Sequence, residues 1–257
     1  MVMTNPSLSE ACCIIKPQIT AFTGGGGKTS LLWALAEERR SAGDMVVATT
    51  TTHILPPLPQ QSDRLVLIEE ANSWQQLREV VAPGRIITIA KGLSPEGKLI
   101  GISGQFCQTL VEMGCQVLVE ADGAARKPFK APATHEPVVP EGTRLQIAVC
   151  GLSVVGKPLQ SQFCHRPERI AALTGAALGT PVTPYEIAQT LASSQGGRKG
   201  LPEEAAFLVC LNQADDAFRL THARTIAALL QELGVRRVLA TCTYKRPIVQ
   251  QCWGDAL

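Results

Sequence analysis

The strongest chemical signal in the sequence is a glycine-rich loop. Residues 23–30 read Thr-Gly-Gly-Gly-Gly-Lys-Thr-Ser, between an apolar run and a stretch rich in helix-forming residues. Glycines let backbone N–H groups surround phosphate oxygens, and the amino terminus of a following helix favours negative charge. Lys28 could reach the β- and γ-phosphates, and Thr29 could offer its hydroxyl to Mg²⁺. The loop predicts binding of Mg²⁺ with ATP or GTP by Gly24, Gly25, Gly26, Gly27, Lys28, Thr29 and Ser30.

The loop departs from the pattern G-x-x-x-x-G-K-S/T at its first position, where Phe22 replaces glycine. The alternative interpretation is a glycine-rich turn that precedes Lys28 and Thr29 by chance. The strand pattern before the loop and the helix pattern after it favour the phosphate site.

Two carboxylates follow a second apolar run. Glu120 and Asp122 come directly after Val117–Val119, two positions apart, so their side chains leave the strand on the same face. A phosphate-binding loop needs an acidic partner for Mg²⁺ at the end of another strand. We expect Asp122 to hold Mg²⁺ with Thr29, and Glu120 to position water, which makes Lys28, Glu120 and Asp122 the candidate catalytic residues. The alternative is an ordinary turn at the end of the strand.

Two polar segments follow other apolar runs. Thr50 belongs to a run of threonines at 49–52 and could face the metal and the γ-phosphate, or simply continue a strand. Asn212 and Asp215 lie in Asn-Gln-Ala-Asp, which is similar to the guanine-reading sequence N-K-x-D with Gln213 in place of lysine. The alternative is that Asp215 or Asp216 caps the next helix. The choice between ATP and GTP stays open.

Basic residues and histidines supply further candidates. Arg126 and Lys130 follow Asp122 and could contact an anionic substrate, although they could equally be solvated loop charges. His135 and His165 lie in polar segments bounded by prolines and could act as an acid, a base or a contact for a partner. Cys164, beside His165, is the one thiol that could take part in chemistry, although an isolated cysteine usually behaves as a small apolar residue.

These residues need a scaffold that brings them to one edge. Nearly continuous apolar runs are typical of strands buried in a parallel sheet. Helical patterns cover 29–40, 73–81 and 216–233. The alternation predicts an α/β fold, a three-layer arrangement like that of P-loop NTPases with a mainly parallel sheet. The expected strands are 18–22, 44–49, 64–68, 85–90, 116–120, 145–150, 206–211 and 236–241.

Composition and charge narrow the class of protein. The 257 residues carry a net charge of +2 and 4% aromatic residues, which argues against a binder of nucleic acid. No apolar run is long enough for a membrane span, and the N-terminus has no export signal. Nine scattered cysteines indicate reduced thiols and a cytoplasmic protein. We expect an N-terminal segment, 1–17, and a single P-loop α/β domain, 18–257, with a small helical excursion around 155–205.

Taken together, the motifs resemble those of selenium-dependent hydroxylase accessory proteins, the YqeC family. The resemblance runs from about Ile19 to Thr243. It implies a role in maturing molybdenum hydroxylases that carry a labile selenium, with such a hydroxylase or a selenium-delivery protein as partner. The resemblance itself defines no reaction. It rests on the glycine loop and on the segments 49–52, 119–123, 130–137, 151–159, 165–168 and 212–215.

Three functions fit these observations. The first is a Mg²⁺-dependent nucleoside triphosphatase that couples hydrolysis to maturation of a hydroxylase. The second is a nucleotide-dependent binding switch or chaperone with little turnover, in which the nucleotide orders residues 49–53 and the proline-rich segment 123–142. The third is a small-molecule kinase in which Arg126 and Lys130 hold the acceptor.

Overall fold

A central sheet of nine strands organises the chain in the computed structural model, which describes residues 6–68 and 74–255. Its order is β14-β13-β12-β10-β1-β8-β2-β5-β4, and all neighbouring pairs are parallel except β13 with β14. The strands are β1 (Ile19–Gly24), β2 (Met45–Thr50), β4 (Arg64–Leu67), β5 (Arg85–Ala90), β8 (Cys115–Glu120), β10 (Thr143–Gly151), β12 (Ala206–Asn212), β13 (Arg237–Thr241) and β14 (Val249–Gly254).

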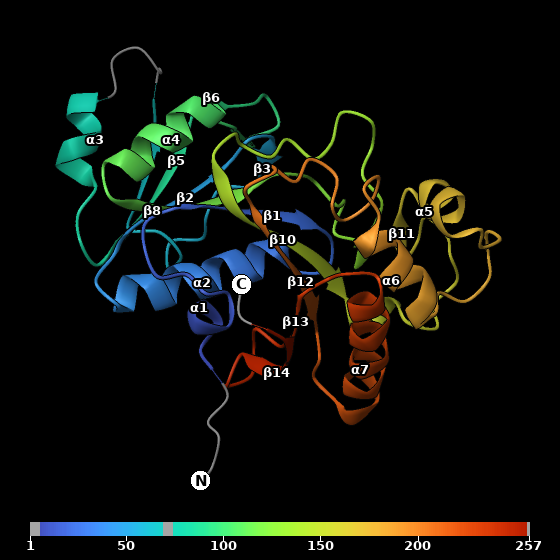
Figure 1. Ribbon diagram of the computed structural model, residues 1–257. Helices are drawn as coiled ribbons and strands as arrows, with labels where there is room; N and C mark the ends of the chain where they lie inside the picture. Colours follow the sequence, from blue (N-terminus) through green and yellow to red (C-terminus); the bar gives the residue numbers. More distant parts are fainter. Residues whose placement is uncertain (1–5, 69–73, 256–257) are drawn as a thin grey trace, which may run out of the picture.

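Helices cover both faces of this sheet and complete three layers (Figure 1). On one face, α1 (Leu8–Ala11) and α2 (Lys28–Ser41) bury their apolar side chains against alternate residues of β1, β2 and β10. On the other face, α3 (Trp74–Val80) and α4 (Gly104–Glu112) pack against β5 and β8. Strand residues alternate between the two cores, as the two-residue period of a strand requires.

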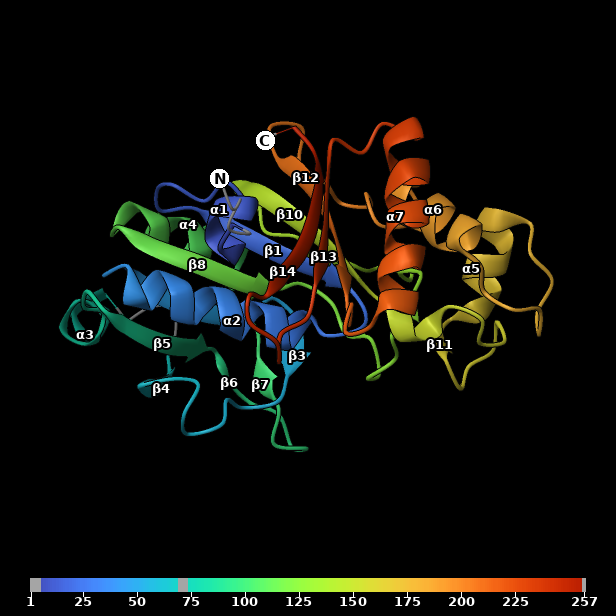
Figure 2. The same cartoon turned by 90° about the horizontal axis from the view of Figure 1, so that it is seen from below.

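A third group of helices covers the β10-β12-β13 end of the sheet. These are α5 (Pro167–Thr174), α6 (Pro184–Ala192) and α7 (Ala217–Glu232), which share one apolar core with the strands (Figure 2). Pro at the first position and Glu186 in a capping box with Thr183 define the start of α6.

Short strands form two small additions at the carboxyl edge. One is a three-stranded sheet of β3 (His53–Ile54), β7 (Leu99–Ile100) and β6 (Gly92–Leu93). The other pairs β9 (Phe129–Lys130) with β11 (Cys164–His165), and a short 3₁₀ helix (Leu152–Val154) follows β10. The β9–β11 pair ties the segment after β8 to the start of α5.

The predicted fold class is confirmed, and each of the eight expected strands is present within one or two residues of its expected bounds. The helix expected at 73–81 is described from Trp74, while Ser73 lies outside the described residues. Strand β14 and helices α1, α4, α5 and α6 were not predicted individually; α5 and α6 occupy the region of the expected excursion. Among the described helices, none has the length and apolar character needed to cross a membrane.

Candidate phosphate-binding site

The glycine loop connects the carboxyl end of β1 to the first turn of α2. Gly24, Gly26 and Gly27 have φ values of 92°, 81° and 114°, which side chains rarely tolerate. The loop also packs closely against its neighbours: a Cβ on Gly26 would lie 2.1 Å from the backbone nitrogen of Gly151. Glycine is therefore required at this position both by backbone conformation and by space.

Backbone N–H groups of this loop fall into two sets. The amides of Gly25 and Gly26 donate to the carbonyls of Val149 and Lys127, at 2.8 and 3.0 Å, and so fix the loop against β10 and against the segment that follows β8. In contrast, the amides of residues 27–30 have no acceptor within the described ranges. These donors open α2, where the helix dipole favours an anion.

Lys28 is buried beneath the loop, with a relative exposure of 4%. Its ammonium group donates to the carbonyl of Gly24 at 2.7 Å and lies 3.3 Å from Oδ1 of Asp122 and 3.7 Å from Oε1 of Glu120. A buried ammonium with two carboxylates is compensated electrostatically. The site thus holds one buried cation between the loop and two acids, and the sequence predicted the cation and both acids as catalytic candidates.

The structure pairs the two acids with different partners. Thr29 donates its hydroxyl hydrogen to Oε2 of Glu120 at 2.7 Å. Asp122 accepts the amide hydrogen of Gly24 at 3.1 Å, while its Oδ1 accepts no hydrogen bond among the described residues. The sequence interpretation joined Thr29 to Asp122. The geometry instead brings Thr29 to Glu120, because β8 lies directly beside β1 and Phe22 pairs with Glu120 in register.

Thr50 lies at the same edge, at the carboxyl end of β2, and pairs in register with Glu120. It is fully buried, and its hydroxyl donates to the carbonyl of Glu120 at 2.6 Å and contacts the hydroxyl of Thr52 at 3.2 Å. The side chain therefore fixes the end of β8 from the adjacent strand. Ser30, by contrast, is exposed on the first turn of α2.

Lys130 extends the charged network away from the loop. Its ammonium group, at 1% side-chain exposure, lies 2.9 Å from Oδ2 of Asp122 and 2.9 Å from Oε2 of Glu136. Arg166 contacts the same oxygen of Glu136 at 2.7 Å. Burial would raise the pKa of Glu136, but hydrogen bonds and charge from Lys130 and Arg166 lower this pKa to about 2. Alternating charges thus run from Lys28 to Arg166.

Sequence reasoning placed Lys130 among possible substrate contacts and missed Glu136 and Arg166. Both missed residues lie inside segments that the family resemblance had singled out, 130–137 and 165–168, and their charged type was the available signal. Arg126 is exposed in a left-handed conformation with φ of 59°, and His135 is also exposed. His165 is half-buried on β11 beside Lys130.

Asn212 and Asp215 have different hydrogen-bond partners: Asn212 contacts the glycine loop, and Asp215 contacts Arg219 and Tyr244. Asn212 is buried at the end of β12, donates to the carbonyl of Gly26 at 2.9 Å and accepts from Thr241 at 3.0 Å. It therefore supports the loop directly. Asp215 accepts hydrogen bonds from Arg219, at 2.6 Å, and from the hydroxyl of Tyr244. Burial opposes ionisation of Asp215, but the hydrogen bonds and charge of Tyr244 and Arg219 together lower its pKa overall.

The helix-capping role that competed with base recognition belongs to Asp216. Its carboxylate accepts the amide hydrogen of Arg219 at 2.8 Å and caps α7. Cys164 is buried on β11, and burial raises its pKa to about 11. Such a thiol contains little thiolate at neutral pH, which does not fit nucleophilic selenium chemistry.

The donors at the loop fit Mg²⁺ when a phosphate completes the coordination. The described residues contain no cluster of three or more acidic, histidine or cysteine side chains that could hold a metal alone. Mg²⁺ usually takes one or two carboxylates and relies on substrate phosphates and water for the rest. The hydroxyl of Thr29 and the carboxylate of Glu120 supply oxygen ligands of this kind, and the amides of residues 27–30 could hold the phosphate that completes the coordination.

These features define a three-layer α/β protein with a glycine loop at the carboxyl edge of a mainly parallel sheet. The chain belongs to the YqeC family: the family model described as YqeC protein matches residues 20–168. It is 29% identical, over 204 residues, to a protein of Escherichia coli strain K12 described as uncharacterized protein YqeC, and the match covers 73% of each chain. The matched family region contains the loop and the network from Lys28 to Arg166, but not Asn212 or Asp215.

Proposed function

We propose that the protein binds Mg²⁺ with ATP or GTP at the glycine loop and hydrolyses the terminal phosphate. The observation that carries this proposal is the buried ammonium of Lys28, which lies between the loop and the paired acids Glu120 and Asp122. A cation in this place, beneath unused helix amides, fits the terminal phosphates of a nucleotide. An exposed or salt-bridged surface lysine would support no such function.

Each group at the glycine loop would have a distinct role in binding the nucleotide. The amides of residues 27–30 would bind the phosphates, and Lys28 would exchange its contact with Asp122 for a phosphate oxygen. Asp122 would remain ion-paired, because Lys130 and the amide of Gly24 still hold its Oδ2. Thr29 and Glu120 would hold the metal or its water. Mg²⁺, when bound, would neutralise charge on the β- and γ-phosphates.

Glu120 and Asp122 therefore exchange the roles that their order in the sequence suggested. Glu120 takes the metal side because Thr29 contacts it. Asp122 takes the positioning side because it contacts Lys28, Lys130 and Gly24. Asp215 would select the base, since its carboxylate is ionised at neutral pH and lies at the end of the strand whose Asn212 contacts the loop.

The family resemblance supports a proposal for the physiological role. We place the protein as an accessory factor in the maturation of selenium-dependent molybdenum hydroxylases, with a hydroxylase or a selenium-delivery protein as its partner in the cytoplasm. Hydrolysis would then drive release or loading of the client. Co-purification of a tagged hydroxylase with the protein, with and without nucleotide, tests this role.

One observation favours a second function, a nucleotide-dependent switch with little turnover. The segment 123–142 contacts the loop through the carbonyl of Lys127, which accepts from Gly26. Phosphate binding would therefore reposition this segment and change what it presents to a partner. Limited proteolysis separates the two functions: the switch requires that a non-hydrolysable nucleotide protects the segment 123–142, and equal cleavage with and without nucleotide excludes it.

Competition of ATP and GTP against one fluorescent nucleotide, with and without Mg²⁺, tests the proposed binding directly. We expect saturable, Mg²⁺-dependent binding that Lys28→Ala weakens by at least 100-fold, since a charge-stabilising contact of this kind is worth about 3 kcal/mol. Lys98→Ala is the matched control, because Lys98 is exposed on the β6–β7 turn. Equal binding by both variants would exclude the loop as the nucleotide site.

A further inference from the structure

A group of basic side chains surrounds the far end of the charged network. We call Lys130, His165, Arg166, Arg169 and Lys199 the basic cluster. They come from β9, β11, the start of α5 and the turn after α6. His165 pairs with Lys130 across the β9–β11 ladder, and Lys199 donates to the carbonyl of Thr134 at 2.8 Å. Segments distant in sequence are thus joined here by direct hydrogen bonds.

The basic cluster holds donors that the protein itself does not use. The side chains of Arg169 and His165 are half-buried and have no hydrogen-bond or ion-pair partner among residues 6–68 and 74–255. Arg166, which adopts a left-handed φ of 60°, directs one guanidinium nitrogen to Glu136. A half-buried guanidinium without an anion is costly unless a ligand supplies one.

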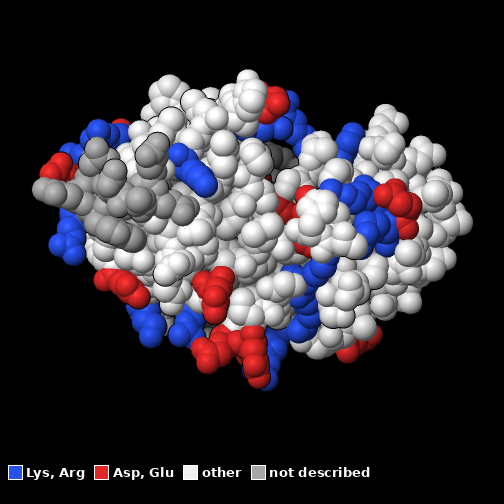
Figure 3. All heavy atoms as spheres, turned by 90° about the horizontal axis from the view of Figure 1, so that it is seen from above, with Lys and Arg blue, Asp and Glu red and all other residues white. Residues whose placement is uncertain are grey.

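The balance of charge around these donors is positive. Lys130, Arg166, Arg169 and Lys199 face two buried or half-buried acids, Asp122 and Glu136, while Glu168 on α5 is exposed. Figure 3 shows Lys and Arg side chains gathered on the side of the molecule where β11 and α5 lie, with acidic side chains beside them.

The pKa values of two residues in the basic cluster respond to this positive charge. The pKa of His165 is lowered by burial and by the charges of Arg166 and Lys130. The pKa of Lys199 is lowered by burial and by the charge of Arg169. Burial is the largest cause of both shifts, and the positive neighbours that add to it would attract an anion.

This basic cluster adjoins the phosphate site. Lys130 contacts Asp122 at 2.9 Å, and Asp122 contacts Lys28 at 3.3 Å. We propose that the basic cluster binds the oxyanion group of a second small molecule, a phosphate or a carboxylate, beside the terminal phosphate of the nucleotide. The planar guanidinium of Arg169 suits a tetrahedral or planar oxyanion, which it can bind through two parallel hydrogen bonds.

The binding site itself does not depend on the proposed function, whereas its description as a second-substrate site does. A nucleotide at the glycine loop would face the bound oxyanion across Asp122 and Lys130. The sequence region of the family model ends at residue 168, so Arg169 and Lys199 lie beyond it. The basic cluster therefore gives this chain a means of selecting its second ligand that the matched region alone does not contain.

Imidazole resonances provide the test, because the chain has four histidines, at 53, 135, 165 and 222. Inorganic phosphate, or acetate in a parallel titration, is added to the full-length protein while the ¹H–¹³C imidazole signals are recorded. We expect a saturable shift of the His165 signal and a rise in its apparent pKa. The signal of His222, whose ring packs against Phe218 on α7, should not shift.

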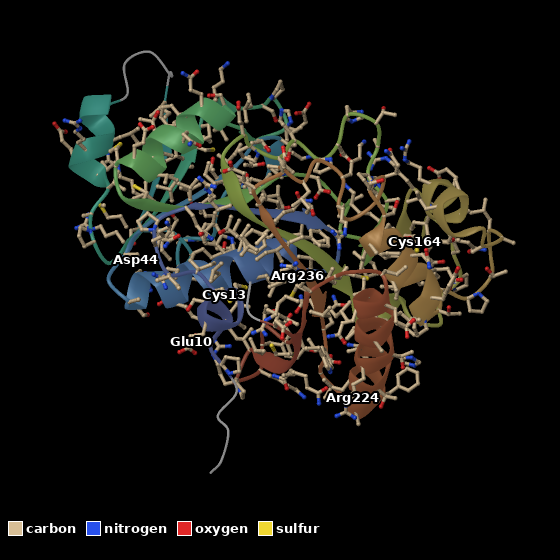
Figure 4. The ribbon with its side chains drawn as sticks, in the orientation of Figure 1. Glu10, Cys13, Asp44, Cys164, Arg224 and Arg236 are labelled. Atoms are coloured by element: carbon tan, nitrogen blue, oxygen red, sulfur yellow. The ribbon has the colours of Figure 1, made fainter. Side chains whose placement is uncertain are left out.

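Three variants locate the anion. Arg169→Ala should weaken the His165 response at least tenfold, and Arg224→Ala, a matched arginine on α7 remote from Cys164 and β11, should leave it unchanged (Figure 4). Lys28→Ala should retain the response, since its change lies in the glycine loop. The inference is overturned if neither anion saturates the His165 signal, or if Lys28→Ala abolishes the response while Arg169→Ala does not.

Nucleotide binding is measured on the same samples, so that the two proposals fail separately. If the protein binds no nucleotide but shows the Arg169-dependent response, the oxyanion site is supported and the proposed function is excluded. If the protein binds nucleotide through Lys28 but shows no His165 response, the proposed function is supported and the oxyanion site is excluded. Saturation by phosphate alone identifies a phosphoryl group, and saturation by acetate as well identifies a general oxyanion site.

Discussion

Thr29 donates its hydroxyl hydrogen to Glu120 across 2.7 Å, although Glu120 and Asp122 lie at the same edge of the sheet. The contact joins the first turn of α2 to the last residue of β8. It gives Glu120 a different partner from Asp122, which accepts the amide hydrogen of Gly24. One acid faces the hydroxyl that would bind a metal, and the other anchors two lysines and the loop backbone.

Exchange of each acid for its amide should therefore give different results. Glu120→Gln keeps the shape but removes the charge beside Thr29, so nucleotide hydrolysis should fall by about 100-fold or more and demand a higher Mg²⁺ concentration. Asp122→Asn leaves Lys28 and Lys130 without their shared carboxylate, so the free energy of unfolding should fall by about 2–3 kcal/mol. Mg²⁺ titrations of activity and urea unfolding measure the two effects. The reverse pattern would restore Asp122 as the metal ligand.

Gly26→Ala should disrupt the loop. The added Cβ would lie 2.1 Å from the backbone nitrogen of Gly151 and 2.7 Å from the carbonyl oxygen of Pro128, at a φ of 81°. We expect at least a tenfold loss of nucleotide affinity, and a loss of stability of about 1–3 kcal/mol from the strained backbone. Gly123→Ala is the control, because a Cβ there meets nothing within 4 Å. Equal affinities of the two variants would contradict the loop assignment.

The sheet could be predicted from the sequence because its strands are buried on both faces. Runs such as Val117–Val119 have no exposed side that would interrupt their apolar pattern. Strand β14 escaped prediction for the opposite reason: it is an antiparallel edge strand with half-buried residues, including Gln251 and Trp253. Its pairing is set by β13, which local sequence does not reveal.

The loop and its two acids could also be predicted, because each lies at the end of a recognisable strand. The different partners of Glu120 and Asp122 could not be predicted, since they depend on which strand lies beside β1. The pairing of Glu136 with Arg166 could not be predicted either, because the two residues are 30 positions apart in the sequence. The β9–β11 ladder brings those two segments together.

Asp215 and Asp216 should also respond differently to replacement. Asp215→Ala removes the ionised carboxylate that Arg219 and Tyr244 hold, so a protein that reads guanine should lose at least tenfold in GTP affinity with little change for ATP. Asp216→Ala removes the cap of α7 and should cost about 1 kcal/mol of stability without changing the preference between nucleotides. Parallel ATP and GTP titrations, with thermal unfolding, compare them. Equal loss of both nucleotides in Asp215→Ala would argue against base reading.

Stability at acidic pH should depend on Glu136. Its pKa is about 2 in the folded protein against an ordinary value of 4.5, because the lowering by Lys130 and Arg166 exceeds the effect of burial. A depressed carboxyl pKa stabilises the fold above the unfolded value, and this contribution is lost as the pH falls from about 4.5 towards 2. Since the group is partly exposed, the contribution is about 1 kcal/mol after solvent screening.

Urea unfolding of Glu136→Gln between pH 7 and pH 3 checks this contribution. The variant should be less stable than the wild type at pH 7. The difference should shrink as the pH falls below about 4.5, because the carboxylate of the unfolded wild type is then protonated and must lose its proton on folding. Glu204→Gln is the matched control, since Glu204 forms an ion pair with Arg144 that is exposed to solvent on both sides. Its effect should be small at every pH. If the deficit of Glu136→Gln is independent of pH, the network from Lys28 to Arg166 does not stabilise the fold through the charge of Glu136.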